Sequence, residues 1–272
     1  MRRFSWFNAT SLTLGFAFLY IPMIILIIFS FNASELVTVW AGFSTRWYGE
    51  LLGNEAFLDA AWVTLQVAVM SSTIATVLGT MAATVMVRGG RFMGRTLFSG
   101  MIYAPLVMPE VITGLSLLLL FIGIGLDRGV LTIVLAHTTF SMCYVSVVVS
   151  SRLVSFDRSL EEAALDLGCS PFEAFRLVTL PIIAPAVISG WLLAFTLSLD
   201  DLVIASFTAG PSATTLPIKI FSSIRLGVSP EINALSTIMI AIVTIGVLTA
   251  SIVSKRASVA QQRDEQAAAR AT

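Results

Sequence analysis

The sequence contains little charge, one histidine and two cysteines. Only 12% of its 272 residues are Asp, Glu, Lys or Arg, about half the share of a soluble globular domain. The formal net charge is zero, so the total shows no electrostatic footprint for nucleic acid. Cys143 and Cys169 lie far apart, and His137 lies alone in an apolar run, so neither a metal site nor a redox motif is predicted.

Apolar residues take the place of the missing charge, at 57% of the chain and a mean hydropathy of +0.92. A spanning helix needs roughly 20 mostly apolar residues. Six stretches meet this requirement: residues 12–31, 62–87, 101–125, 130–150, 181–207 and 233–253. The first is longer than a signal-peptide core and no A-x-A cleavage site follows it, so we expect an uncleaved span. The sequence therefore predicts an all-α membrane protein with a six-span domain over residues 1–255 and a polar tail over 256–272.

The basic residues predict the orientation of these spans. With the N-terminus in the cytoplasm, twelve of the sixteen lysines and arginines fall in inside segments. The other four, in outside segments, are Arg46, Arg128, Lys219 and Arg225. This excess of inside positive charge predicts cytoplasmic positions for both termini. The outside segment "TRWYGELLGNEAFLDA" is expected to form a short interfacial helix, and "LPIKIFSSI" is expected to form a short re-entrant or surface helix within an irregular loop.

The polar segment 157–180 between the fourth and fifth spans contains two helix starts. Ser159 with Glu162, and Ser170 with Glu173, have the S-x-x-E spacing of a capping box. Pro171 occupies the favoured first position of the second helix. Gly168 falls where a helix would end in a left-handed cap. The segment therefore predicts a helix, a tight turn and a second helix.

The first of these helices is predicted to be amphipathic. Leu160, Ala163, Ala164 and Leu167 follow the i, i+3, i+4, i+7 spacing of one helix face. Such a face either packs against its own bundle or docks in a groove of another protein. The small alanines would let that other surface approach closely.

This segment resembles the cytoplasmic loop of the integral-membrane subunits of binding-protein-dependent ABC importers. That loop has the form E-A-A, three residues, G, nine residues, I, any residue, L-P. The chain matches every spacing, with valine in place of isoleucine, at Glu162, Ala163, Ala164, Gly168, Val178, Leu180 and Pro181. The likeness covers nearly the whole chain. The pieces "APLVMPEVITGLSLLLLF" and "LAFTLSLDDLVIASFTAGPSATTLPIKIFSSIR" are similar to polyamine importer permeases, and to the putrescine type in particular.

The resemblance implies an inner-membrane permease of the type I importer fold whose loop couples ATP-driven closure to motion of the spans. It implies a second permease subunit, a dimer of ATPase subunits and a periplasmic polyamine-binding protein as partners. The chain itself would then be no enzyme and hold no cofactor, because ATP and Mg²⁺ would bind to the ATPase subunits. Lipid is the remaining expected partner, and nucleic acid is not one.

Three acidic residues lie within apolar runs: Glu110, Asp200 and Asp201. Acids inside a membrane are costly and usually line a pathway or pair with another group. Pro105 and Pro109 would break or kink the third span and free carbonyl groups beside Glu110. Such oxygens suit the ammonium groups of a polyamine, so the three acids are candidates for the substrate path. Asp200 and Asp201 also lie near the expected outer end of their span, where a charge costs little.

Other functions are less well supported by the sequence. An ion-coupled secondary transporter of organic cations would explain the intramembrane acids and His137, but it gives no reason for the loop motif. A self-contained ATPase would need a P-loop. Residues 89–96, "GGRFMGRT", have Arg95 where that motif needs lysine. An enzyme using Asp200 and Asp201 would need two carboxylates that converge from different elements.

Overall fold

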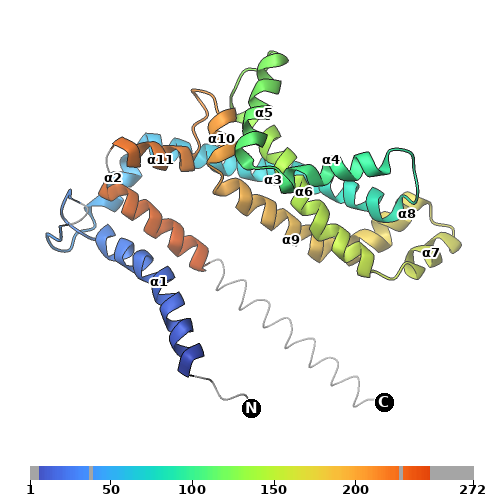
Figure 1. The fold of residues 1–272 in the computed structure, drawn as a ribbon, viewed down its shortest axis with the longest axis horizontal. Helices are drawn as coiled ribbons and strands as arrows, with labels where there is room; N and C mark the ends of the chain where they lie inside the picture. Colours follow the sequence, from blue (N-terminus) through green and yellow to red (C-terminus); the bar gives the residue numbers. More distant parts are fainter. Residues whose placement is uncertain (1–5, 37–38, 227–228, 246–272) are drawn as a thin grey trace. The chain divides into compact units, whose positions relative to one another are not determined.

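The structure is a computed structural model that describes residues 6–36, 39–226 and 229–245 and is almost entirely helical (Figure 1). The described part contains one isolated antiparallel bridge, between Asn32 and Phe43. The chain divides into two units, residues 1–55 with 223–272, and residues 56–222.

The first unit contains α1 (Trp6–Ser30), α2 (Arg46–Gly53) and a further helix over Pro230–Ile245. Asn32 organises the loop between α1 and α2. Its side-chain Nδ2 donates to the carbonyl of Val39, and its Oδ1 accepts from the backbone N–H of Ala41 at 2.8 Å. The indole N–H of Trp47 donates to the Asn32 carbonyl at 2.7 Å. The short helix predicted near Trp47 is therefore present and anchored to the end of α1.

The second unit contains the remaining elements. They are α3 (Glu55–Arg88, whose first residue belongs to the first unit), α4 (Arg95–Val107), α5 (Glu110–Gly123), α6 (Val130–Ser155), α7 (Ser159–Asp166), α8 (Pro171–Ala174), the π-helix η1 (Phe175–Thr179), α9 (Leu180–Leu199), α10 (Val203–Thr208) and α11 (Leu216–Leu226, which ends in the first unit). The predicted surface helix around "LPIKIFSSI" corresponds to α11.

Close packing on α6 builds the core of this unit. Helices α6 and α9 run side by side (Figure 1). A Cβ atom on Gly79 of α3 would lie 2.7 Å from the carbonyl oxygen of Met142, and one on Gly190 of α9 would lie 3.2 Å from Val145. Small residues of this kind let membrane helices approach at backbone distance.

Four described helical stretches are long and apolar enough to cross a membrane, or five when the bent pair α4–α5 counts as one. The predicted third span, 101–125, is broken: α4 ends at Val107, α5 begins at Glu110, and the two differ in direction by 117°. The break falls at Met108–Pro109, in agreement with the kink expected from Pro105 and Pro109. A proline in a helix removes a hydrogen bond and clashes with the preceding turn.

The predicted fifth span was too long. The helix ends at Leu199, three non-helical residues follow, and the apolar sequence that continues to Phe207 forms the separate short helix α10. Of the predicted sixth span, 233–253, the residues up to Ile245 are helical, and the rest lies outside the described residues, as does the predicted tail. The count of six spans therefore stays a prediction.

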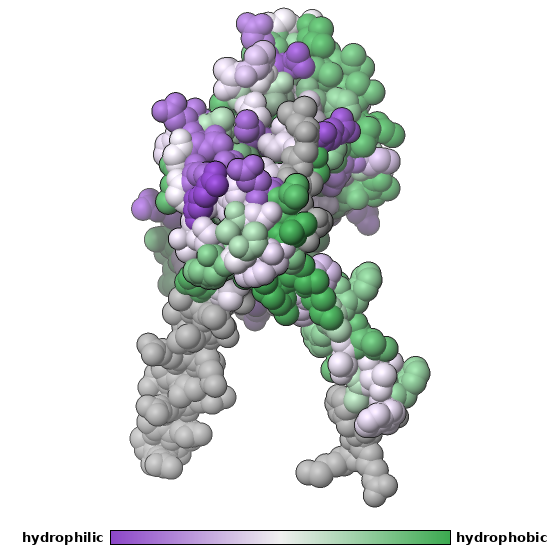
Figure 2. Space-filling view, turned by 90° about the vertical axis from the view of Figure 1, so that its left-hand side faces the viewer, coloured by the Kyte–Doolittle hydropathy of each residue, from purple (hydrophilic) through white to green (hydrophobic). Residues whose placement is uncertain are grey.

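Large apolar side chains remain exposed along the helices. On α1, Trp6, Phe7 and Phe18 are each more than 75% exposed. In Figure 2, green, apolar side chains gather along the right-hand side of the face, beside purple and white residues at its centre. Exposed apolar surface of this extent marks contact with membrane or with other chains, as the composition predicts.

Candidate functional site

The loop 157–180 has the predicted order of helix, turn and helix. α7 ends at Asp166, and Gly168 has a φ of +93°, the left-handed cap expected of a glycine there. Ser170 and Glu173 form the predicted capping box around α8, with Pro171 at its start. Hydrogen bonds from the backbone N–H and hydroxyl of Ser170 lower the pKa of the Glu173 carboxyl.

The other predicted capping box, Ser159 with Glu162, is wrong. Ser159 is the first residue of α7, and its backbone N–H donates to Asp157 Oδ1 at 3.0 Å. This bond lowers the pKa of Asp157. Glu162 instead lies 3.4 Å from the guanidinium of Arg158, one turn earlier on the exposed side. An aspartate two residues upstream therefore takes the place of the predicted serine.

The predicted apolar face of α7 is mostly exposed. Ala164 is buried, whereas Leu160 is 48% and Leu167 is 87% exposed. Two apolar residues further along, Phe172 and Leu177, are 71% and 63% exposed. Within the described chain, the loop thus presents apolar side chains that its own bundle does not cover.

The end of the loop motif leads into the bundle. Val178 and Leu180 are half-buried and Pro181 is exposed. Leu180 packs against a buried cluster of α3, α6 and α9 that contains Ala83, Val145, Val149, Leu153, Ile183 and Ala194. The motif therefore runs from an exposed helix into the core of the second unit.

One polar cluster behind α7 was missed by the sequence analysis. The side chain of Glu161 turns toward the bundle, where one of its oxygens lies 2.9 Å from Arg88 Nε and the other accepts from Thr179 Oγ1 at 2.8 Å. The guanidinium of Arg88 also lies over the ring of Phe156, 5.6 Å from its centre. Arg88 and Glu161 are 73 residues apart, so no local spacing signals their contact.

The structure separates the three acids predicted for a substrate path. Glu110 is exposed at the first turn of α5, beside the break after α4, and its side chain has no hydrogen bond or ion pair within the described residues. Asp200 is exposed at the end of α9. The side chain of Asp201 is only 11% exposed and has several partners. The adjacent aspartates thus face different surroundings.

Asp201 holds the beginning of α10. It accepts from the backbone N–H groups of Ile204 and Ala205, at 3.2 and 2.7 Å. Its Oδ2 also lies 2.9 Å from His137 Nε2, an ion-pair distance, although the angle at the ring nitrogen departs from that of a hydrogen bond. His137 Nδ1 lies 2.7 Å from the hydroxyl of Ser198, which accepts from Ser71 Oγ.

This polar network joins three helices of the second unit. Ser71 comes from α3, His137 from α6 and Ser198 from α9. The other end of α10 is held as well, because Thr132 of α6 donates its hydroxyl to the carbonyl of Thr208 at 2.8 Å. His137 is therefore a packed, paired residue, the role that the sequence favours for a lone histidine. The described residues contain no group of three or more His, Cys, Asp or Glu arranged for a metal ion.

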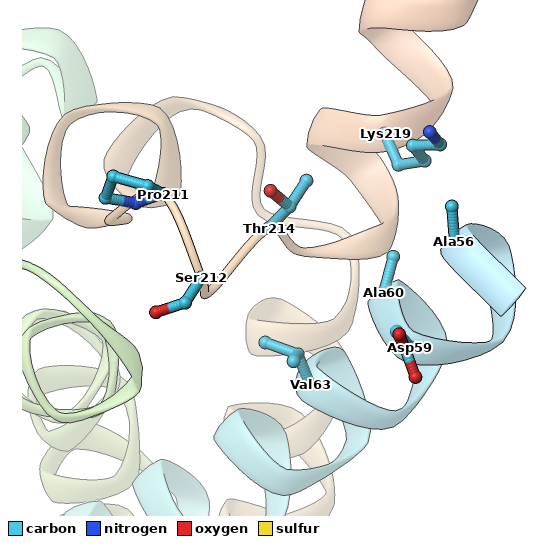
Figure 3. A pocket seen from close by; sticks show the side chains of 8 residues that line it. All are labelled: Ala56, Asp59, Ala60, Val63, Pro211, Ser212, Thr214 and Lys219. Carbon is cyan, nitrogen blue, oxygen red and sulfur yellow. The ribbon is translucent and has the colours of Figure 1, made fainter.

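A cavity of about 290 Å³ lies between the start of α3 and the segment that links α10 to α11 (Figure 3). One wall of the cavity comes from α3 and the opposite wall from the linking segment, with Lys219 of α11 at one side. The wall from α3 consists of Ala56, Asp59, Ala60 and Val63, and the wall from the linking segment consists of Pro211, Ser212 and Thr214. The linking segment is fixed because the N–H of Leu216 donates to Thr64 Oγ1 at 2.7 Å. Asp59 contributes one carboxylate and Lys219 one ammonium group, so the cavity lining has no net charge.

These features define a helical membrane protein of the importer permease class, and comparisons with known proteins agree. A bacterial ABC transporter that imports the acidic polysaccharide alginate has a chain of the same fold, with a TM-score of 0.73 at 18% identity, covering 93% of this chain and 96% of that one. A chain of the MetNI methionine ABC transporter has a TM-score of 0.59 at 15% identity, covering 71% and 92%.

Residues 75–259 match the family described as the binding-protein-dependent transport system inner membrane component, and the chain belongs to that family. It is 59% identical to the putrescine transport system permease protein PotI of Escherichia coli (strain K12), over 95% of this chain and 94% of that protein. It is 43% identical to the spermidine/putrescine transport system permease protein PotC of the same organism, over 90% and 92%. The chain is thus a multi-pass inner-membrane protein.

Proposed function

We propose that this chain is a permease subunit of an ATP-driven putrescine importer. The observation that carries the proposal is the loop 157–180, whose motif residues Glu162, Ala163 and Gly168 stand on an exposed helix and turn. Its uncovered apolar side chains, Leu160 and Leu167, suit a groove on another protein. The similarity to PotI and PotC supports a polyamine as the substrate.

Both termini and the loop then lie in the cytoplasm, where ATPase subunits dock on α7 and α8. ATP and Mg²⁺ bind to those subunits, and this chain contributes motion rather than hydrolysis. A second permease subunit completes the path across the membrane, and a periplasmic binding protein delivers the polyamine. The large exposed apolar surface of the described helices leaves ample area for lipid and for a second permease.

Within the path, Glu110 and Asp200 are the candidate contacts for the ammonium groups. Both carboxylates are exposed, and Glu110 lies at a helix break, where backbone groups are free to line a cavity. Asp201 is engaged by His137 and by the start of α10, so its contribution to the path is to hold α10 in place.

The test is uptake of labelled putrescine by proteoliposomes that contain this chain, its partner permease and the ATPase subunits, with the binding protein outside. The proposal expects uptake that needs enclosed ATP and persists when a protonophore dissipates the proton gradient. Uptake without ATP that the protonophore abolishes would instead support an ion-coupled carrier. The relatives give no support to that alternative.

A further inference from the structure

Only a small apolar contact joins α7 to the bundle. Of its eight residues, Ala164 alone is buried, and an alanine methyl group contributes little hydrophobic free energy on burial. A cavity of about 280 Å³ lies beside the helix, lined in part by Thr84, Arg88, Leu165 and Phe175. Packing therefore does not fix α7 against the bundle, and polar contacts must carry the connection.

Glu161 supplies those contacts, and its partners come from two different elements. Arg88 is in the last turn of α3, where a positive charge is favoured by the helix dipole. Thr179 is the last residue of η1, directly before α9. One carboxylate thus joins the loop helix to the end of one span and to the start of another.

Burial makes this junction selective for its partners. The side chains of Arg88 and Glu161 are only 18% and 16% exposed. Within the described residues, Arg88 has no hydrogen-bond acceptor other than Glu161, and its Nη2 is buried without one. Removing one partner of a buried ion pair leaves an uncompensated charge. Moving α7 without α3 would separate Glu161 from Arg88 in the same way, so the pair resists that movement.

We infer that Glu161 is a positioning residue that transmits displacement of α7 to α3 through Arg88 and to α9 through Thr179. The π-helix η1 lies at this junction, and single π-helical turns within α-helices are frequently found at functional sites. The inference rests on the proposed function, since it assumes that ATPase subunits move α7. It assigns the outward residues of α7 to docking and the inward Glu161 to transmission.

The experiment uses the complete transporter in proteoliposomes and measures putrescine imported per ATP hydrolysed, together with the amount of ATPase that co-purifies. The variants are Glu161→Arg, Arg88→Glu and the double exchange. Asp127→Arg is the control, because Asp127 is an exposed acid outside the loop 157–180 whose side chain has no partner in the described chain. Glu161→Gln and Thr179→Val are milder variants that keep side-chain size.

We expect each single reversal to lower the import-to-hydrolysis ratio about tenfold or more while ATPase still co-purifies, and the double exchange to recover most of it. The control should have the import-to-hydrolysis ratio of the wild type, and the milder variants should have ratios between those of the wild type and the single reversals. An unchanged ratio in the milder variants, or a double exchange no better than the single reversals, would overturn the inference. A wild-type transporter with no ATP-driven uptake would contradict the proposed function itself, which keeps the two failures distinct.

Discussion

His137 Nε2 lies 2.9 Å from Asp201 Oδ2, whereas the neighbouring Asp200 is exposed. The pair fastens the start of α10 to α6, and Ser198 and Ser71 extend it to α9 and α3. Two adjacent aspartates therefore have different roles. Asp201 is held by the bundle, and Asp200 is exposed, as its proposed contact with a cationic substrate requires.

Replacing Asp201 should therefore lower stability, and replacing Asp200 should not. In Asp201→Ala, the backbone N–H groups of Ile204 and Ala205 lose their acceptor, and His137 loses the carboxylate beside its Nε2. Each unsatisfied buried group costs about 1–3 kcal/mol. We expect a clear fall in the melting temperature of the purified transporter. Asp200→Ala is the matched control and should melt like the wild type while taking up less putrescine. Equal melting temperatures for the two variants would contradict the division of roles.

Gly210 should tolerate no larger residue. A Cβ atom there would lie 1.9 Å from the carbonyl oxygen of Arg128, which is backbone and cannot swing away. Overpacking of this kind typically costs about 1–3 kcal/mol, so Gly210→Ala should lower the melting temperature. Gly123→Ala is the control, because a Cβ at Gly123 meets no atom within 4 Å. The explanation fails if the two variants melt alike.

The cap at Ser170 and Glu173 predicts a dependence on pH. The pKa of Glu173 lies below its ordinary value of 4.5 in the folded loop. The stability that the Glu173 carboxylate gives to the start of α8 is therefore complete above that value and is lost as the pH falls through the folded pKa. Amide exchange of the first turn of α8, corrected for intrinsic rates, should stay constant from neutral pH down to about 5 and rise below 4.5. Glu173→Gln should remove this dependence, and a Gln variant that still shows it would exclude Glu173 as its source.

Local chemistry explains what the sequence analysis predicted correctly. The apolar runs, the Gly168 cap and the Ser170 box depend on residues within a few positions of each other, which the sequence displays directly. The Ser159 box failed because Asp157 offers a competing acceptor to the same helix start. The end of α9 was missed because the apolar run continues past Asp200, even though the two aspartates interrupt it.

Contacts between distant residues could not be predicted from one sequence. Glu161 meets Arg88 only after α3, α6 and α7 have packed, and His137 meets Ser198 across 61 residues. The sequence shows the pair of acids Glu161–Glu162, but the pair does not indicate a partner for either residue. Glu161 lies toward Arg88 and Glu162 toward Arg158, because successive residues of a helix differ in direction by about 100°.

Substitution of Gly168 tests the loop turn. Its φ of +93° lies in a region that costs other L-residues about 1–2 kcal/mol. Gly168→Ala should therefore shift the helix pair and weaken stimulation of ATP hydrolysis by the loaded binding protein. Gly100→Ala, at a glycine with no positive φ and no atom within 4 Å, should leave stimulation unchanged. A Gly168→Ala transporter stimulated like the wild type would contradict a requirement for this turn.

The most direct test of the importer assignment is co-purification of the chain with its ATPase and partner permease, followed by measurement of ATP hydrolysis with and without putrescine-loaded binding protein. We expect ATPase to co-purify with the wild type and to be stimulated by the loaded binding protein. We expect Gly168→Asp and Glu162→Lys to lose the ATPase or its stimulation. If no ATPase co-purifies with the wild type, or if both loop variants behave like it, the loop is not the coupling element and the account is contradicted.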